Sequence, residues 1–167
     1  MVKEVTSLPV DVHLMVTNPE FYIPVFADES PRVLSIQAEA TSHIQHVLAR
    51  IRDYGIQSGL ALNPLTPLNV SDYILLDLDV ILITIVNPGF AGQKIIPATI
   101  QKVAQVRKIL DEQGYEAEIE VDGNVRRENI SKLVNPGATM LVGGTSSIFK
   151  KGYQIPDAVQ KVYDLIV

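Results

Sequence analysis

Acidic side chains alternate along one short apolar segment. Glu118, Glu120 and Asp122 occupy every second position of the segment 118–122, so in a β-strand they share one face. Unpartnered buried carboxylates carry a large desolvation cost, which a metal ion, an Arg or Lys, or exposure of Glu118 at the strand start would relieve. Asp122 is therefore a candidate catalytic residue. Because Gly123 follows it, a turn-forming role is the alternative.

A histidine lies on another apolar segment. Asp11, His13 and Met15 alternate along Asp11-Val12-His13-Leu14-Met15, and a strand would place them on one face. A lone histidine on such a strand is usually a hydrogen-bonded core residue. Its imidazole is also a common metal ligand, so His13 is a candidate ligand.

Two glycine-bearing turns are candidates for binding an anion. They are Asn87-Pro88-Gly89-Phe90-Ala91-Gly92-Gln93 and Gly143-Gly144-Thr145-Ser146-Ser147. Small residues let backbone N–H groups approach a phosphate, and the loops after the last barrel strands often bind one. The alternative is that these glycines serve only as turns. The sequence predicts an anion site here, with Gly123 and Asn124 between the two turns.

Each of these residues follows or ends a short β-branched segment, and such segments alternate with segments of helical period. Their nearly continuous apolar runs are typical of parallel strands covered on both faces. The carboxyl ends of such strands share one site in a barrel. The predicted strands are 11–16, 33–38, 58–62, 80–86, 118–122 and 139–142, and the predicted helices are 19–27, 42–54, 67–74, 97–113, 126–134 and 156–166.

The helix over 97–113 is the one that the sequence pattern predicts most clearly. Polar residues such as Lys102 lie mostly away from its apolar face, and Gly114 is the predicted C-terminal cap. The apolar face consists of Ile100, Val103, Ala104, Val106 and Leu110.

The alternation predicts an α/β fold of the TIM (β/α)8-barrel type, N-terminally truncated to about six β/α units. The Gly-rich turn before the last helix is typical of a final barrel loop. No Gly/Ser linker interrupts the chain, so we expect a single partial β/α-barrel domain over residues 1–167. An open sheet exposes unpaired backbone groups at its edges. We therefore expect a homo-oligomer, specifically a dimer, that covers them.

Composition excludes several classes of function. The chain has 20% charged residues, a net charge of -5 and no cationic run, which argues against nucleic-acid binding. It has no Cys and no apolar stretch near the roughly 18–20 residues that cross a membrane. With no secretory h-region, a cytoplasmic location is expected. No Gly-x-Gly-x-x-Gly follows the first strand, which disfavours a doubly wound nucleotide-binding fold.

Several motifs together resemble the ribulose-phosphate 3-epimerase family, which includes hexulose-phosphate relatives such as allulose-6-phosphate 3-epimerases. The resemblance implies a ribulose-phosphate-binding barrel and an isomerase of carbohydrate metabolism, including the pentose phosphate route. The implied reaction moves the C3 proton of ribulose 5-phosphate or a hexulose 6-phosphate through an enediolate. One divalent metal, Zn, Fe, Mn or Co, is implied as Lewis acid. The motifs are Asp11-Val12-His13-Leu14-Met15-Val16, Leu62-Asn63-Pro64-Leu65-Thr66-Pro67, Val86-Asn87-Pro88-Gly89-Phe90-Ala91-Gly92-Gln93, Glu118-Ile119-Glu120-Val121-Asp122-Gly123 and Val142-Gly143-Gly144-Thr145-Ser146.

The resemblance also implies roles for particular residues. Asp122 matches a catalytic acid that is also a metal ligand, and His13 matches another metal ligand. The positions implied to contact the sugar phosphate are His13, Gly89, Phe90, Ala91, Gly92, Gly123, Asn124, Gly144, Thr145 and Ser146.

Some positions depart from the family pattern. Gln37 stands where most relatives have His, Thr84 where they have Met, and Asn124 replaces the second Gly of an Asp-Gly-Gly turn. The family's His-x-Asp arrangement does not occur before His13. Two hypotheses stay open. The first is a ketose-phosphate epimerase, either with a site that another chain completes or represented here by a shortened reading frame. The second is a catalytically incomplete sugar-phosphate-binding remnant. The second predicts little turnover, whereas C3 proton exchange that depends on Asp122 supports the first.

Overall fold

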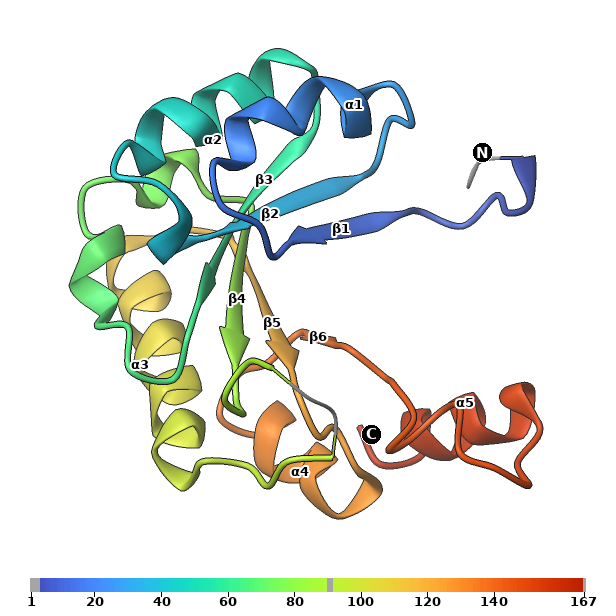
Figure 1. The fold of residues 1–167 in the computed structure, drawn as a ribbon. Coiled ribbons are helices and arrows are strands. Elements are labelled where there is room, and N and C mark those ends of the chain that lie inside the picture. The colour runs from blue at the N-terminus through green and yellow to red at the C-terminus, as the bar shows by residue number, and fades with distance from the viewer. Residues whose placement is uncertain (1–3, 90–91, 167) are drawn as a thin grey trace. The chain divides into compact units, whose positions relative to one another are not determined.

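The computed structural model describes residues 4–89 and 92–166 (Figure 1). The chain forms two compact units. Unit 1 comprises residues 1–62 and 66–81, and unit 2 comprises residues 63–65 and 82–167. The expectation of a single domain over residues 1–167 stays a prediction.

The strands follow one another across the sheet in chain order, β1-β2-β3-β4-β5-β6. This order is the one that successive β/α units of a barrel produce. The strands are β1 (Asp11–Leu14), β2 (Val33–Gln37), β3 (Gln57–Leu62), β4 (Val80–Thr84), β5 (Glu118–Asp122) and β6 (Met140–Leu141), and the α-helices are α1 (Ile23–Ala27), α2 (Ile44–Asp53), α3 (Pro97–Gln113), α4 (Arg127–Val134) and α5 (Ile155–Tyr163).

In unit 1, β1, β2 and β3 pair in parallel. All five residues of β2 are buried, as its continuous apolar run predicts for a strand covered on both faces. Figure 1 shows α1 and α2 on the same side of these strands. The buried side of α2 carries Val47, Leu48 and Ile51.

β2 and β3 approach each other closely at one point. Ser35 and Gly59 are register partners. A methyl group added to Gly59 would lie 2.0 Å from the Ser35 Oγ, so only glycine fits beside Ser35 at this place.

In unit 2, β5 and β6 pair in parallel, with Glu120 opposite Met140. The helix α3 has the predicted bounds. Pro97 occupies its first turn, where the missing N–H costs nothing. Gly114 ends it with φ of 72°, and the Tyr115 N–H donates to the Leu110 carbonyl at 3.0 Å. The predicted glycine cap is confirmed.

The buried face of α3 differs from the predicted one. Ala104 is exposed, whereas Lys102 is buried. The Lys102 Nζ donates to the Asn63 carbonyl at 2.8 Å and to the Pro64 carbonyl at 3.0 Å. The ammonium group is buried because the turn after β3 supplies carbonyl acceptors for it.

Two predicted helices are shorter than expected. The prediction of a helix over 67–74 is wrong, because only a 3-10 helix forms there, at Leu68–Ser71. The Ser71 hydroxyl donates back to the Leu68 carbonyl, a local bond that competes with helix formation. The predicted helix 19–27 divides into a 3-10 helix (Pro19–Phe21) and α1.

Among the described residues, no helix is both long enough and apolar enough to pass through a lipid bilayer.

Candidate functional site

The three turns that follow β4, β5 and β6 meet in unit 2. The Asn124 Nδ2 donates to the Gln93 carbonyl at 2.6 Å, which links the turn after β5 to the turn after β4. The Ser146 hydroxyl donates to the Val125 carbonyl at 3.5 Å, which links the turn after β6 to the same segment. The turns predicted to hold an anion therefore lie beside Asp122.

Asp122 is the last residue of β5 and is half-buried. The Ile85 N–H, just after β4, donates to the Asp122 carbonyl at 2.8 Å. On the other side of β5, the Val142 N–H donates to the Val121 carbonyl at 3.0 Å. Both neighbouring segments hold the backbone that carries this carboxylate, so its position does not depend on a loose loop.

Gly123 allows the chain to turn directly after Asp122. Its φ is +108°, and a methyl group there would lie 2.6 Å from the Val86 Cγ2. Both the backbone angle and the neighbouring side chain therefore demand glycine. Asn124 continues the turn in the left-handed region, with φ of 47°. The turn-forming role predicted as the alternative for this segment is thus real, and it sets the position of Asp122.

The turn after β4 contains Gly89 and Gly92, both with positive φ. Apart from the chain neighbours of each glycine, no atom of the described residues lies within 4 Å of a methyl group built on either. The Gln93 side-chain amide closes the turn by donating to the Asn87 carbonyl. The backbone on this side of the turn is therefore open to an approaching group. Phe90 and Ala91, also predicted to contact substrate, lie outside the described residues.

The turn after β6 is organised around the Gly144 carbonyl. It accepts from the backbone N–H groups of Ser147, Ile148 and Phe149 at 3.0 to 3.1 Å. Thr145 and Ser146 of this turn line a cavity of about 270 Å³.

This cavity is rich in positive charge. Arg126, Arg127 and Lys150 line it together with a single acidic residue, Glu128. Cationic side chains and hydroxyl groups around one cavity favour a phosphate-like anion. These cations are not among the site residues predicted from the sequence. The adjacent Arg126-Arg127 pair at the start of the helix after Asp122 was the available signal.

His13 lies in unit 1 and contacts Gln37. The two Nε2 atoms are 2.9 Å apart. His13 is half-buried and Gln37 is 7% exposed. Met15 does not belong to the predicted face, because β1 ends at Leu14 and Met15 is exposed.

Asp11 begins β1 and belongs to the exposed residues, yet its surroundings disfavour the charged carboxylate. Desolvation by neighbouring groups raises the pKa of Asp11 from its ordinary value, and the Arg32 guanidinium opposes this by lowering it. Desolvation is the larger effect.

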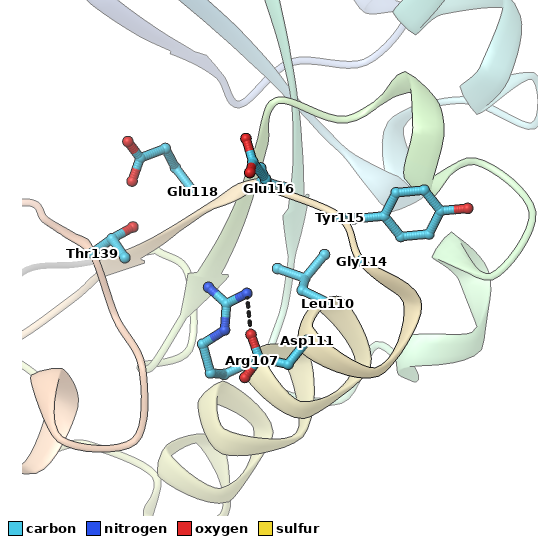
Figure 2. A pocket seen from close by; sticks show the side chains of 9 residues that line it. Arg107, Leu110, Asp111, Gly114, Tyr115, Glu116, Glu118 and Thr139 are labelled. Carbon is cyan, nitrogen blue, oxygen red and sulfur yellow. Dashed lines mark ion pairs between the residues drawn. The ribbon is translucent and has the colours of Figure 1, made fainter.

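The acidic residues of β5 lie at different places along the strand, with Asp122 as its last residue. Glu118, its first residue, lines a cavity of about 450 Å³ (Figure 2). Arg107 also lines this cavity and pairs with Asp111 at 2.7 Å. Glu120 is buried, with 5% exposed. Which of a metal ion, an Arg or Lys, or exposure of Glu118 relieves the desolvation of these acids stays a prediction.

Thr84, where the family pattern has Met, is buried at the end of β4. Its hydroxyl donates to the Asn63 Oδ1 at 3.4 Å. The Asn63 carbonyl also accepts from Lys102. The turn after β3 is thereby tied to β4 and α3 within unit 2.

The metal ligands present do not make up a metal site by themselves. Across residues 4–89 and 92–166, no group of three or more His, Cys, Asp or Glu side chains is placed to hold a metal ion. Protein metal sites of this kind use three or four protein ligands. His13 and Asp122, which the resemblance implies as metal ligands, lie in different units.

Residues 1–149 match the model of the Ribulose-phosphate 3 epimerase family. The chain is 42% identical over 146 residues to a ribulose-phosphate 3-epimerase of Bacillus subtilis (strain 168), covering 87% of this chain and 67% of that protein. It is 40% identical over 148 residues to the one of Escherichia coli (strain K12), covering 89% and 66%. The chain thus spans about two thirds of the length of these relatives.

Solved structures share the fold. A 3-hexulose-6-phosphate synthase from Salmonella typhimurium has a TM-score of 0.73 at 14% identity, covering 98% of this chain and 75% of that one. A tryptophan synthase alpha-subunit from Pyrococcus furiosus has a TM-score of 0.68 at 18% identity, covering 98% and 69%. With the chain-order strands, this confirms the predicted α/β fold of TIM-barrel type.

Proposed function

We propose that this chain, which belongs to the ribulose-phosphate 3-epimerase family, acts on a ketose phosphate, with Asp122 transferring the proton at C3. The observation that carries the proposal is the meeting of three turns around Asp122. Hydrogen bonds from Asn124 and Ser146 join these turns. Ribulose 5-phosphate is the first substrate to test, and a hexulose 6-phosphate the second.

The proposed binding region for the phosphate group of the substrate lies beside Asp122. Thr145 and Ser146 line the cavity with Arg126, Arg127 and Lys150. The positive φ and open surroundings of Gly89 and Gly92 support a second contact region on the turn after β4. We propose that the phosphate lies between these turns and that the sugar carbons reach toward Asp122.

The proposed chemistry is proton transfer next to a carbonyl group. The Asp122 carboxylate removes the C3 proton, and the electrons of the C–H bond move into an enediolate whose negative charge rests on the C2 oxygen. Return of a proton to the opposite face of C3 gives the epimer. The resemblance implies a second acid on that face. Asp122 serves as base in one direction and as acid in the other.

The resemblance also implies one divalent metal, of the kind that stabilises an enediolate as Lewis acid. Because the ligands among the described residues do not make up a metal site, we assign no step to a metal. Which metal serves the family site in this protein stays a prediction, and so does the cytoplasmic location.

A second candidate function is sugar-phosphate binding without turnover. The observation that favours it is the pairing of His13 with Gln37, in place of a three-ligand group around His13. The two candidates share the phosphate cavity and differ in the proton transfer.

The test is solvent exchange at C3. The protein is incubated with ribulose 5-phosphate in D₂O, with and without Mn²⁺, and the C3 proton is followed by ¹H NMR. We expect exchange that Asp122→Asn slows by about 10² or more. Asp157→Asn, on the exposed first turn of α5, is the matched control and should exchange at the wild-type rate.

Calorimetric binding of ribulose 5-phosphate separates the two candidates. Binding without exchange would support the sugar-phosphate-binding remnant and exclude the epimerase. The absence of both binding and exchange would exclude both candidate functions.

A further inference from the structure

Gln37 contacts one ring nitrogen of His13, the Nε2 atom. His13 and Ser35 are register partners on β1 and β2, and Gln37 lies two residues beyond Ser35 on the same face. This places the Gln37 Nε2 2.9 Å from the His13 Nε2. A contact this short between two nitrogens requires that one donate and the other accept.

The chemistry of the two groups decides their roles. A glutamine Nε2 carries hydrogens and can only donate. The His13 Nε2 must therefore accept, which makes the ring neutral and leaves its proton on Nδ1. A divalent cation binds histidine through the lone pair of a deprotonated ring nitrogen. In this form the lone pair lies on Nε2, where it already accepts from Gln37.

Burial makes the contact costly to break. Gln37 is 7% exposed, and within the described residues its Oε1 is buried with no hydrogen-bond partner. An amide N–H displaced from His13 would lose its acceptor in this buried place and carry the desolvation cost of a buried polar group. Metal binding at His13 therefore competes with a hydrogen bond that the protein interior protects.

We propose that Gln37 is a positioning residue that holds His13 in the Nδ1–H form and competes with divalent cations for the His13 Nε2. This competition involves the side chains of His13 and Gln37 alone and does not depend on whether the chain epimerises a sugar phosphate. A histidine at the position of a family metal ligand can therefore be present without binding a metal, because Gln37 occupies its lone pair.

The tautomer of His13 is the first test. Long-range ¹H–¹⁵N spectra at about pH 8.5, where imidazoles are neutral, distinguish Nδ1–H from Nε2–H. We expect Nδ1–H for His13 in the wild type and Nε2–H in Gln37→Met, which keeps a long unbranched side chain without the amide. The exposed His43 and His46 serve as internal references.

A second apolar variant, Gln37→Leu, repeats the measurement should the first not fold. Gln101→Met, at an exposed position of α3, is the matched control and should leave His13 unchanged. An Nε2–H ring in the wild type, or an Nδ1–H ring in both Gln37 variants, would overturn the proposal.

Metal affinity is the second test. Co²⁺ is titrated while the His13 resonance is followed, so cation bound at His43 or His46 does not count. We expect Gln37→Met to bind at least about tenfold more tightly than wild type, the scale on which partners of a ligating histidine change metal affinity. His13→Asn in the Gln37→Met background should remove the added binding. Equal affinity of wild type and variant at His13 would contradict the competition.

Discussion

Asp11 provides a pH-dependent contribution to stability. Because desolvation raises its pKa above the usual 3.8, the folded protein binds this proton more tightly than the unfolded chain does. The group therefore lowers the free energy of unfolding as the pH rises from 3.8 through the raised folded pKa. We expect Asp11→Asn to raise the Tm at about pH 7 and to match the wild type below about pH 3.8. Thermal melts across this range measure the difference.

The control for Asp11→Asn is Asp157→Asn, which removes the same charge from an exposed helix turn. A lower Tm of Asp11→Asn at neutral pH would show that attraction to Arg32 outweighs desolvation, contrary to the expected order of the two effects.

Single side chains were predictable from the sequence only where their role is local. The Asp122-Gly123 pair predicts a turn directly after the carboxylate, and the structure has this turn. The contact between His13 and Gln37 depends instead on the register of β1 against β2. Burial of Lys102 depends on carbonyl groups 39 and 38 residues away. Residue type and spacing predict neither the register of two strands nor the distant partners of a lysine.

The turn after β5 is the element on which the candidate site depends most. We expect Gly123→Ala to lower the free energy of unfolding by roughly 2 to 6 kcal/mol, because backbone strain adds to the collision with Val86. Urea unfolding measures it. Gly55→Ala is the matched control: its φ is also positive, with no atom within 4 Å of the added methyl group. It should cost only about 1–2 kcal/mol.

Equal losses for the two glycine variants would mean that Val86 moves aside at no cost. The turn would then not hold Asp122 as tightly as its contacts indicate.

A helix was predicted with the right bounds where helix-starting and helix-ending residues stand at both ends of a periodic segment. Pro97 and Gly114 delimit α3, and its bounds agree with the structure. The segment 67–74 has Pro67 at its start, but Asn69, Ser71 and Asp72 follow, and such residues bond to nearby backbone rather than extend a helix. A proline start alone was therefore insufficient evidence for a helix.

At the scale of the whole molecule, the strand order leaves β1 and β6 at its two ends. An end strand carries backbone N–H and C=O groups that pair readily with another chain. We therefore expect a dimer, with a light-scattering mass about twice the 18.4 kDa of one chain. A dilution series supplies the control, since a specific dimer dissociates as the concentration falls. A mass of one chain at every concentration would rule the dimer out.

The division into two units was not predictable from composition. Its boundary passes between Ile81 and Leu82, inside the continuous apolar strand β4. A linker rich in Gly or Ser would have predicted such a boundary, but the sequence has no such linker. The fold type, in contrast, follows from the repeated alternation of strands and helices along the chain.

The close approach at Gly59 ties the evolution of two positions together. Any side chain at position 59 needs the volume that the Ser35 hydroxymethyl group now fills. A library that varies position 59 alone should return glycine almost exclusively. A library that varies both positions should recover alanine at 59 only in clones that have exchanged Ser35 for glycine. Substitutions at the two positions are therefore expected to occur together.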